Sequence, residues 1–163
     1  MIIFVAAHGN KRELGFKGGL PWPLMKADRA HLHTVANGKT VVMGEKTVHN
    51  YTSASESYAT DHVLVLSRSK KTTLPGIEVV GDIKVLIDRA KNEDLYVVGG
   101  ALVFGQLLPY AQRMYVTEID GEFEADTYFP EYSTEQWRIC ESVRHIADAD
   151  NPFAYTFKTL ERC

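Results

Sequence analysis

Short runs rich in β-branched residues recur along the chain, and segments of helical character separate them. The runs are Ile2–Ala7, Thr40–Met43, His62–Leu66, Ile77–Val80, Leu95–Val98 and Met114–Ile119. The helical segments are Lys26–Asn37, which Gly38 can end, a short one after Gly44, Ile83–Lys91, which Asp82 can cap, and Ala101–Leu108, which Pro109 stops. Strands that alternate with helices in this way predict an α/β fold, with a largely parallel sheet and helices on both faces.

The pattern changes after Pro130. Two further strands are predicted, Trp137–His145 and Phe153–Leu160, joined by the turn-rich segment 147–152. They form an antiparallel hairpin that closes a mixed sheet. The 163 residues carry no evident linker or repeat, so we expect one domain, residues 1–163.

The composition argues against several classes of protein. With a net charge of −3, the chain lacks the clustered excess of Lys and Arg that a nucleic-acid or anionic-membrane partner requires. Cys140 and Cys163 cannot build a disulfide framework, which favours a reducing cytoplasm. The apolar run Ile2–Ala7 is too short for a membrane span or a signal sequence. His31 and His33 point to different faces of one helix, so we expect no metal site.

The stretch Gly18–Asp28 begins with two glycines, stiffens through Pro21-Trp22-Pro23 and enters the first predicted helix. Asp28 lies in the first turn, on the same face as Leu32 and Val35. An acid at a helix start commonly does no more than complement the helix dipole. Here it heads an apolar stripe, and a carboxylate among apolar groups is costly unless something binds it. Asp28 is therefore a candidate ligand-recognition group.

Two predicted strand-to-helix junctions carry glycine, Gly44 before Glu45-Lys46-Thr47 and Gly99-Gly100 before the helix at Ala101. Glycine lets a ligand approach the backbone, and the helix behind it offers N–H groups to a phosphate, although many such glycines form only tight turns. The first junction is not a P-loop, because the earlier glycine is absent and Lys46 does not follow a glycine. Two junctions in one parallel sheet predict a nucleotide at the carboxyl edge of the strands. Ser67-Arg68-Ser69, after a third strand, suits a phosphate monoester.

An ordered set of motifs runs through the chain. Its members are Val5-Ala6-Ala7, Leu14-Gly15, Leu20-Pro21-Trp22, Asp28, Met43-Gly44 with Thr47, Leu66-Ser67, Val98-Gly99-Gly100, Tyr115-Val116-Thr117 and Asp126-Thr127-Tyr128-Phe129-Pro130. In order and approximate spacing this set resembles the dihydrofolate reductase family over essentially the whole chain. The resemblance implies a mixed, mostly parallel eight-stranded sheet with about four flanking helices.

The resemblance also implies a cofactor. NADPH would lie across the strand edge with its pyrophosphate at the two glycine junctions, and the peptide between Gly99 and Gly100 would be cis. The implied cofactor-binding residues are Ala7, Leu14, Gly15, Gly19, Leu20, Gly44, Glu45, Lys46, Thr47, Leu66, Ser67, Arg68, Val98, Gly99, Gly100, Ala101, Leu102, Val103 and Phe104.

The implied substrate is dihydrofolate, with its pteridine between the first strand and the Asp28 helix. Asp28 would accept hydrogen bonds from the 2-amino group and N3, and Thr117 would brace that end. Hydride would pass to pterin C6, and N5 would take a proton from water admitted past a mobile loop, residues 10–22. The implied catalytic residues are Asp28, Trp22, Leu20 and Thr117, and the substrate-binding residues are Val5, Ala6, Ala7, Asp28, Arg29, Leu32, Tyr51, Val98, Phe104 and Thr117. Members of the family are usually monomers.

Two departures from the family pattern stand out. Between Thr47 and His62 the family usually has an Arg that binds the glutamate α-carboxylate of folate, and this chain has none there. Arg29, with His33 one turn along the helix, is a candidate substitute. Glu45 stands where the family often has a basic residue facing the NADPH 2′-phosphate. With Lys46 and Arg68 nearby in sequence, we still expect NADPH to be preferred over NADH.

Two alternatives remain open. One is a reductase of the same fold acting on another pterin or on a pyrimidine, as in riboflavin synthesis; such an enzyme does not need Trp22 and Asp28 at this spacing. The other is a nucleotide-binding homologue with little turnover, which the missing Arg keeps open and the intact Asp28, Trp22 and Thr117 oppose.

Overall fold

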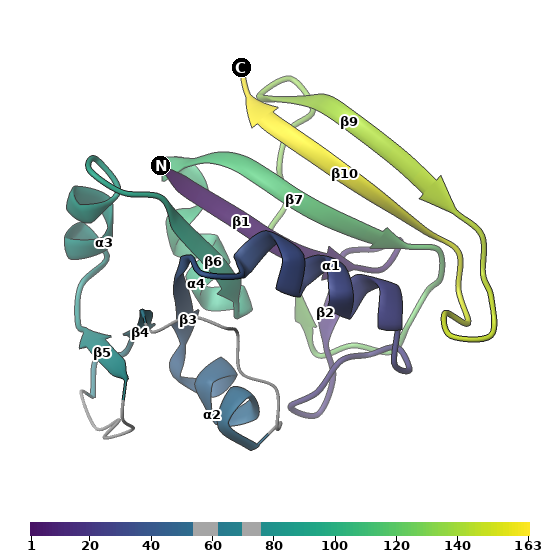
Figure 1. Cartoon of the computed structure of the whole chain (residues 1–163), viewed down its shortest axis with the longest axis horizontal. Coiled ribbons are helices and arrows are strands. Elements are labelled where there is room, and N and C mark those ends of the chain that lie inside the picture. Colours follow the sequence, from purple (N-terminus) through teal and green to yellow (C-terminus); the bar gives the residue numbers. More distant parts are fainter. Residues whose placement is uncertain (54–61, 70–75) are drawn as a thin grey trace.

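An eight-stranded mixed sheet with strand order β5-β4-β3-β6-β1-β7-β10-β9 forms the centre of the molecule (Figure 1). The computed structural model describes residues 1–53, 62–69 and 76–163, with the side chains of 50–53 left aside. The parallel strands are β1 (Ile2–His8), β3 (Thr40–Gly44), β4 (Val63–Leu66), β5 (Ile77–Val80), β6 (Leu95–Gly99) and β7 (Ala111–Ile119). The antiparallel hairpin is β9 (Trp137–His145) and β10 (Tyr155–Arg162). The predicted sheet and hairpin are confirmed.

Four α-helices flank the sheet in the described ranges: α1 (Lys26–Ala36), α2 (Glu45–Ser53), α3 (Ile83–Arg89) and α4 (Ala101–Leu107). Asp82 caps α3 as predicted, because its carboxylate accepts the Lys84 N–H at 2.9 Å. Gly38 follows α1 with a φ of +68°, the left-handed conformation that ends helices. Pro109 does not end α4 directly; it lies in a 3₁₀ turn, η1 (Leu108–Tyr110), where a missing N–H is tolerated. None of the described helices is long and apolar enough to cross a membrane.

The alternation of side chains along β1 divides the core between the two faces of the sheet. Ile2 and Phe4 belong to the cluster that contains Leu86 of α3 and Phe104 of α4. Ile3 and Val5 point the other way, into a cluster against which residues of α1 pack. The carboxyl ends of β1, β3 and β6 therefore meet between two packed layers, which is where ligands bind in open α/β sheets.

A second sheet, of two strands, was not predicted from the sequence. It pairs β2 (Glu13–Gly15) with β8 (Thr127–Tyr128), and both strands are too short to show an alternating pattern. The buried carboxylate of Glu13 accepts the N–H groups of Lys11 at 2.9 Å and Phe123 at 3.1 Å. The amino half of the loop 10–22 is therefore tied to the segment that precedes β8.

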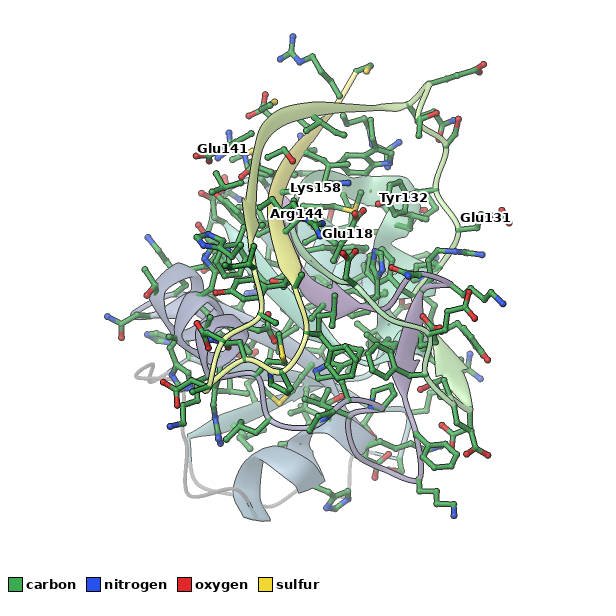
Figure 2. All side chains as sticks on the ribbon, turned by 90° about the vertical axis from the view of Figure 1, so that its right-hand side faces the viewer. Glu118, Glu131, Tyr132, Glu141, Arg144 and Lys158 are labelled. Atoms are coloured by element: carbon green, nitrogen blue, oxygen red, sulfur yellow. The ribbon has the colours of Figure 1, made fainter. Side chains whose placement is uncertain are left out.

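Ion pairs connect the carboxyl-terminal hairpin to β7 and the turn after it. Lys158 of β10 lies 2.6 Å from Glu118 of β7, and Arg144 of β9 lies 2.7 Å from Asp120. Figure 2 shows the hairpin from the side that it covers, with Lys158 close to Glu118. The pairs add to the β10–β7 ladder, which runs from Tyr155 to Glu161. The hairpin is thereby fixed relative to β7.

Candidate active site

Asp28 and Thr117 meet across the face of the sheet that α1 covers. Leu32 and Val35 of α1 pack on the cluster of Val5, and this apolar contact holds the helix over β1 and β7. The carboxyl group of Asp28 is hydrogen-bonded to the hydroxyl of Thr117, which is only 2% exposed. Burial raises the pKa of Asp28 to about 6, and the bond to Thr117 opposes that rise in part. The result is an acid that ionises near neutral pH beside an apolar wall.

Trp22 adds a hydrogen-bond donor to the acceptor that Asp28 provides. Its ring is 5% exposed and belongs to a cluster with Met25, against which Ala7 and Ala27 pack. The indole Nε1–H has no acceptor among the described residues. A buried donor is nearly always hydrogen-bonded in a folded protein, so this N–H fits a site that receives a polar ligand or water. Carboxylate, hydroxyl and indole together suit a flat ring that carries both donors and acceptors.

The two glycine junctions come together at the carboxyl ends of β3 and β6. A Cβ on Gly44 would stand 3.0 Å from a methyl group of Val103 and 3.6 Å from the Gly100 nitrogen. A Cβ on Gly99 or Gly100 would stand 3.5 Å or 3.4 Å from the Thr47 hydroxyl. The Gly99–Gly100 peptide is cis, as expected. Two glycine backbones at one edge, beside the first turn of α2, form a surface that a pyrophosphate can approach closely.

Glu45 lies beside the serines that follow β4. The hydroxyl of Ser67 donates to the Glu45 carboxylate at 3.0 Å, and that of Ser69 does so at 3.3 Å. The two hydroxyls are 3.0 Å apart. The hydroxyls predicted for a phosphate monoester thus already bind a carboxylate, while Lys46 and Arg68 are exposed beside them in sequence.

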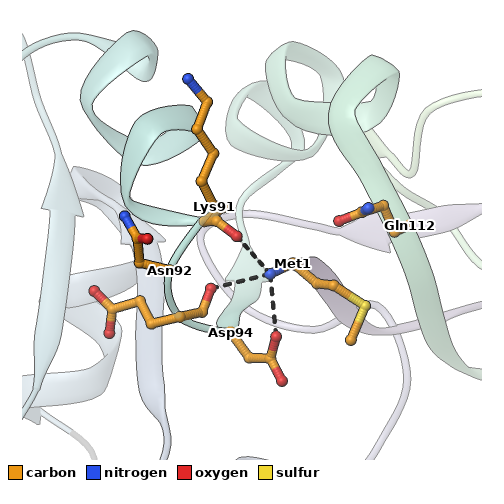
Figure 3. A pocket seen from close by; sticks show the side chains of 7 residues that line it. Met1, Lys91, Asn92, Asp94 and Gln112 are labelled. Carbon is orange, nitrogen blue, oxygen red and sulfur yellow. Dashed lines mark hydrogen bonds and ion pairs between the residues drawn. The ribbon is translucent and has the colours of Figure 1, made fainter.

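Among the hollows on the surface of the described part, two are relevant here. One, of ≈ 480 Å³, runs along the outer side of α1 and is lined by Leu24, Lys26, Arg29, Ala30 and His33. The other, of ≈ 540 Å³, lies where the parallel strands begin and is lined by Met1, residues 90–94 and Gln112 (Figure 3). There the amino group of Met1 donates to the carbonyls of Ala90 and Glu93 and to the Asp94 carboxylate. Although larger, this second hollow is at the wrong edge of the sheet for a nucleotide.

Known proteins are similar to this chain over nearly their whole length. The family model described as dihydrofolate reductase matches residues 1–162. The dihydrofolate reductase of Bacillus subtilis is 32% identical over 163 residues, 99% of this chain and 95% of the relative. That of Staphylococcus aureus is 30% identical, covering 97% and 96%. A solved dihydrofolate reductase from Enterococcus faecalis, complexed with NADP(H) and RAB-propyl, has a TM-score of 0.89 at 25% identity, covering 99% of this chain and 96% of its own.

The chain belongs to the dihydrofolate reductase family. The family and fold predicted from the sequence are therefore confirmed, as is the enzyme class, an oxidoreductase.

Other residues that the resemblance to dihydrofolate reductases singled out lie in varied settings. Val5, Leu32 and Val98 share one apolar cluster, as a common wall requires. Phe104 is buried on the other face of the sheet with Phe4, while Ala6, Leu14 and Leu66 pack against that cluster. Gly15 and Gly19 lie on the loop 10–22, and Ala101 begins α4. Leu20 and Leu102 are 60% and 76% exposed. The side chain of Tyr51 lies outside the described part.

Sequence reasoning missed one residue that the structure joins to this site. Asn151, in the β9–β10 loop, accepts the N–H of Ala27, the residue before Asp28, at 2.9 Å. A signal for it existed: Met25, at the N-cap position of α1, has no side-chain oxygen with which to cap the helix.

Proposed function

We propose that this protein reduces 7,8-dihydrofolate to tetrahydrofolate with NADPH, transferring hydride to pterin C6 while N5 is protonated. The observation that carries the proposal is the pair of half-buried Asp28 and buried Thr117, on the face of a sheet whose edge presents the Gly44 and Gly99-Gly100 junctions. The relative from Enterococcus faecalis, complexed with NADP(H), has the same fold.

Each group of the chain has a defined task in this reaction. Bound NADPH supplies the hydride. Ionised Asp28 accepts hydrogen bonds from the 2-amino group and N3, which fixes the ring in its plane, and Thr117 holds the carboxylate in place. Val5 and Leu32 form an apolar wall that keeps water from the ring. Asp28 binds the opposite end of the pteridine from N5, so we propose that water admitted past the loop 10–22 delivers the N5 proton.

Loss of NADPH absorbance on adding dihydrofolate tests the proposal. A parallel assay uses a pterin that lacks the glutamate tail. Turnover of dihydrofolate supports the proposal, and no turnover of either substrate rejects it in favour of a nucleotide-binding homologue. Preference for the tail-less pterin would reassign the substrate.

We further propose that residues 1–163 act as one domain and as a monomer in the cytoplasm, without a nucleic-acid partner.

This chain lacks the Arg with which the family usually binds the glutamate α-carboxylate of folate, so another residue has to bind it. Arg29 lines the hollow on α1 together with His33, one turn away. Replacing Arg29 by Ala is expected to raise KM for dihydrofolate by roughly 10–100-fold, because an Arg–carboxylate pair contributes about 1.5–3 kcal/mol. The value of kcat is expected to change little, since the tail is bound equally in ground and transition states. Steady-state kinetics with NADPH at saturation measures both.

The tail-less pterin is the control for this variant. Its KM is expected to be the same for wild type and Arg29→Ala, and Arg29→Lys is expected to recover only part of the loss because Lys cannot bind a carboxylate in bidentate fashion. An unchanged KM for dihydrofolate in Arg29→Ala would show that the tail is bound elsewhere.

The choice of cofactor offers a separate prediction. Wild type is expected to prefer NADPH over NADH, and Glu45→Gln is expected to raise that preference about tenfold. The substitution removes a negative charge beside the hydroxyls of Ser67 and Ser69, where it opposes a phosphate monoester, and keeps an acceptor for them. The ratio of kcat/KM for the two cofactors is the measurement. Equal efficiency of wild type with both cofactors, or a lower NADPH preference in Glu45→Gln, would contradict this.

A further inference from the structure

The amino end of α1, which carries Asp28, is capped by a residue distant in sequence. The N-cap residue Met25 has an extended backbone and makes no side-chain cap hydrogen bond. The N–H of Ala27 instead donates to the side-chain oxygen of Asn151 at 2.9 Å. Figure 1 shows the β9–β10 loop beside this end of the helix. Asn151 thus performs the task of an N-cap, which contributes about tenfold to the stability of a helix end.

The amide of Asn151 is itself held in one orientation. Asn151 is 4% exposed, and its side-chain nitrogen donates to the Asp148 carboxylate at 3.0 Å. The same carboxylate oxygen accepts the N–H groups of Asp150 and Asn151, both at 2.8 Å. With the nitrogen directed at a carboxylate, the oxygen of the amide is left to face Ala27. The loop therefore presents a fixed acceptor to the helix.

The loop is connected rigidly to the strand that carries Thr117. Phe157 of β10 lies directly opposite Thr117 in the β10–β7 ladder. On the helix side, Phe157 stacks on His31 of α1, with ring centroids 4.1 Å apart and planes 18° apart. The ion pair between Lys158 and Glu118, the residues that follow Phe157 and Thr117, runs diagonally across the same ladder. The hairpin thus contacts α1 at two points, one on each side of Asp28 along the helix.

We propose that Asn151 is a positioning residue for Asp28: its amide, oriented by Asp148, fixes the first turn of α1 so that the Asp28 carboxyl meets Thr117. It acts through Asp28 and does not contact the substrate. The proposal rests on the proposed function only for its kinetic readout, since the placement of Asp28 can be measured without turnover.

Two causes shift the pKa of Asp28, and other charged groups lie on the described elements around it. Burial is the larger cause of its raised pKa and the Thr117 hydrogen bond the smaller, opposing one. The other titratable or charged groups on α1, on the strands packed beside it and in the β9–β10 loop are Lys26, Arg29, His31 and His33 of α1, His8 of β1, Tyr96 of β6, Arg113, Tyr115 and Glu118 of β7, Arg138, Cys140, Glu141, Arg144 and His145 of β9, Asp148 and Asp150 of the loop, and Tyr155, Lys158, Glu161 and Arg162 of β10. If the first turn of α1 opens, water reaches the carboxyl and the larger cause weakens. The pKa of Asp28 then falls.

The test compares Asn151→Ala with Asp150→Ala in the full chain. Both remove a contact between this loop and α1, but Asp150→Ala removes only the exposed ion pair with Lys26 and leaves the cap. A carbon-13 NMR titration of the Asp28 carboxyl, assigned with Asp28→Asn, reports its pKa. We expect Asn151→Ala to lower that pKa by roughly half to one unit and to raise KM for dihydrofolate about tenfold. Asp150→Ala is expected to match wild type in both.

If Asn151 only stabilised the fold, without positioning Asp28, the same measurements would give a different result. If Asn151→Ala lowers Tm but leaves the pKa of Asp28 and KM equal to those of Asp150→Ala, the proposal is overturned. If Asn151→Ala does not fold, Asp148→Asn decides by the same two measurements. It weakens the bond that orients the Asn151 amide and keeps the cap acceptor, so smaller shifts in the same directions are expected. Absence of turnover in wild type would reject the proposed function alone, because the NMR titration still applies.

Discussion

Replacing Asp28 by Asn is expected to lower kcat/KM for dihydrofolate by about 30–5,000-fold at pH 7, the cost of removing one partner of a buried charge-assisted hydrogen bond. Asn has nearly the shape of Asp but carries no charge, and its amide nitrogen would face a donor of the pterin ring. A charge-assisted hydrogen bond is then replaced by an unpaired donor in a buried site, which is the costly case. Steady-state kinetics with NADPH at saturation measures the loss. The dependence of kcat/KM on pH near 6, where the Asp28 carboxyl ionises, is expected to disappear in the variant.

Two controls distinguish a loss of substrate recognition in Asp28→Asn from a general disturbance of the fold. Asp88→Asn removes a carboxylate from α3, where Asp88 pairs with Lys91 on the exposed surface, and should leave kcat/KM unchanged. NADPH binding to Asp28→Asn, followed by protein fluorescence without substrate, should be close to that of wild type, because the glycine junctions are intact. If Asp28→Asn keeps its kcat/KM within threefold of wild type, the carboxylate is not the recognition group.

The parts of this site that follow from sequence are those encoded in contiguous residues. β3 and β6 are runs of apolar residues that end in glycine, so both the strands and their junctions could be predicted. Asp28 could be singled out because the apolar face of α1 shows in its own spacing. The resemblance to dihydrofolate reductases then supplied Thr117 as the partner of Asp28, and the two are hydrogen-bonded.

The parts that did not follow depend on which elements become neighbours. Asn151 caps α1 across 124 positions of sequence; Met25 at the N-cap position shows that a capping group is needed, but nothing in the sequence indicates that Asn151 supplies it. The Glu45–Ser67 hydrogen bond requires that β3 and β4 pair in parallel and that α2 begins beside the end of β4. Glu13 appeared to be a loop acid, yet it is buried because two backbone N–H groups bind it. Long-range polar contacts of this kind carry no periodic signal.

Asp28→Asn is also expected to stabilise the fold at neutral and alkaline pH. The pKa of Asp28 is about 6 in the folded chain, against an ordinary value of 3.8 that the unfolded chain shows. Between these two values the folded state binds more protons, so the free energy of unfolding falls as pH rises through this window. Well above pH 6 the whole penalty of ionising this carboxyl in the folded chain is present, about 3 kcal/mol. Asn carries no such penalty.

The variant should therefore have a Tm higher than wild type by roughly 6–12 °C at pH 8. The difference should vanish below about pH 3, where Asp28 is protonated in both the folded and the unfolded chain. Thermal unfolding measured at several pH values gives the curve, with Asp88→Asn as the control for removing a surface carboxylate. A constant difference at all pH values would mean that shape and not charge distinguishes the two side chains. A pH-dependent gain in stability with a loss of turnover would identify Asp28 as a group kept for function at the expense of stability.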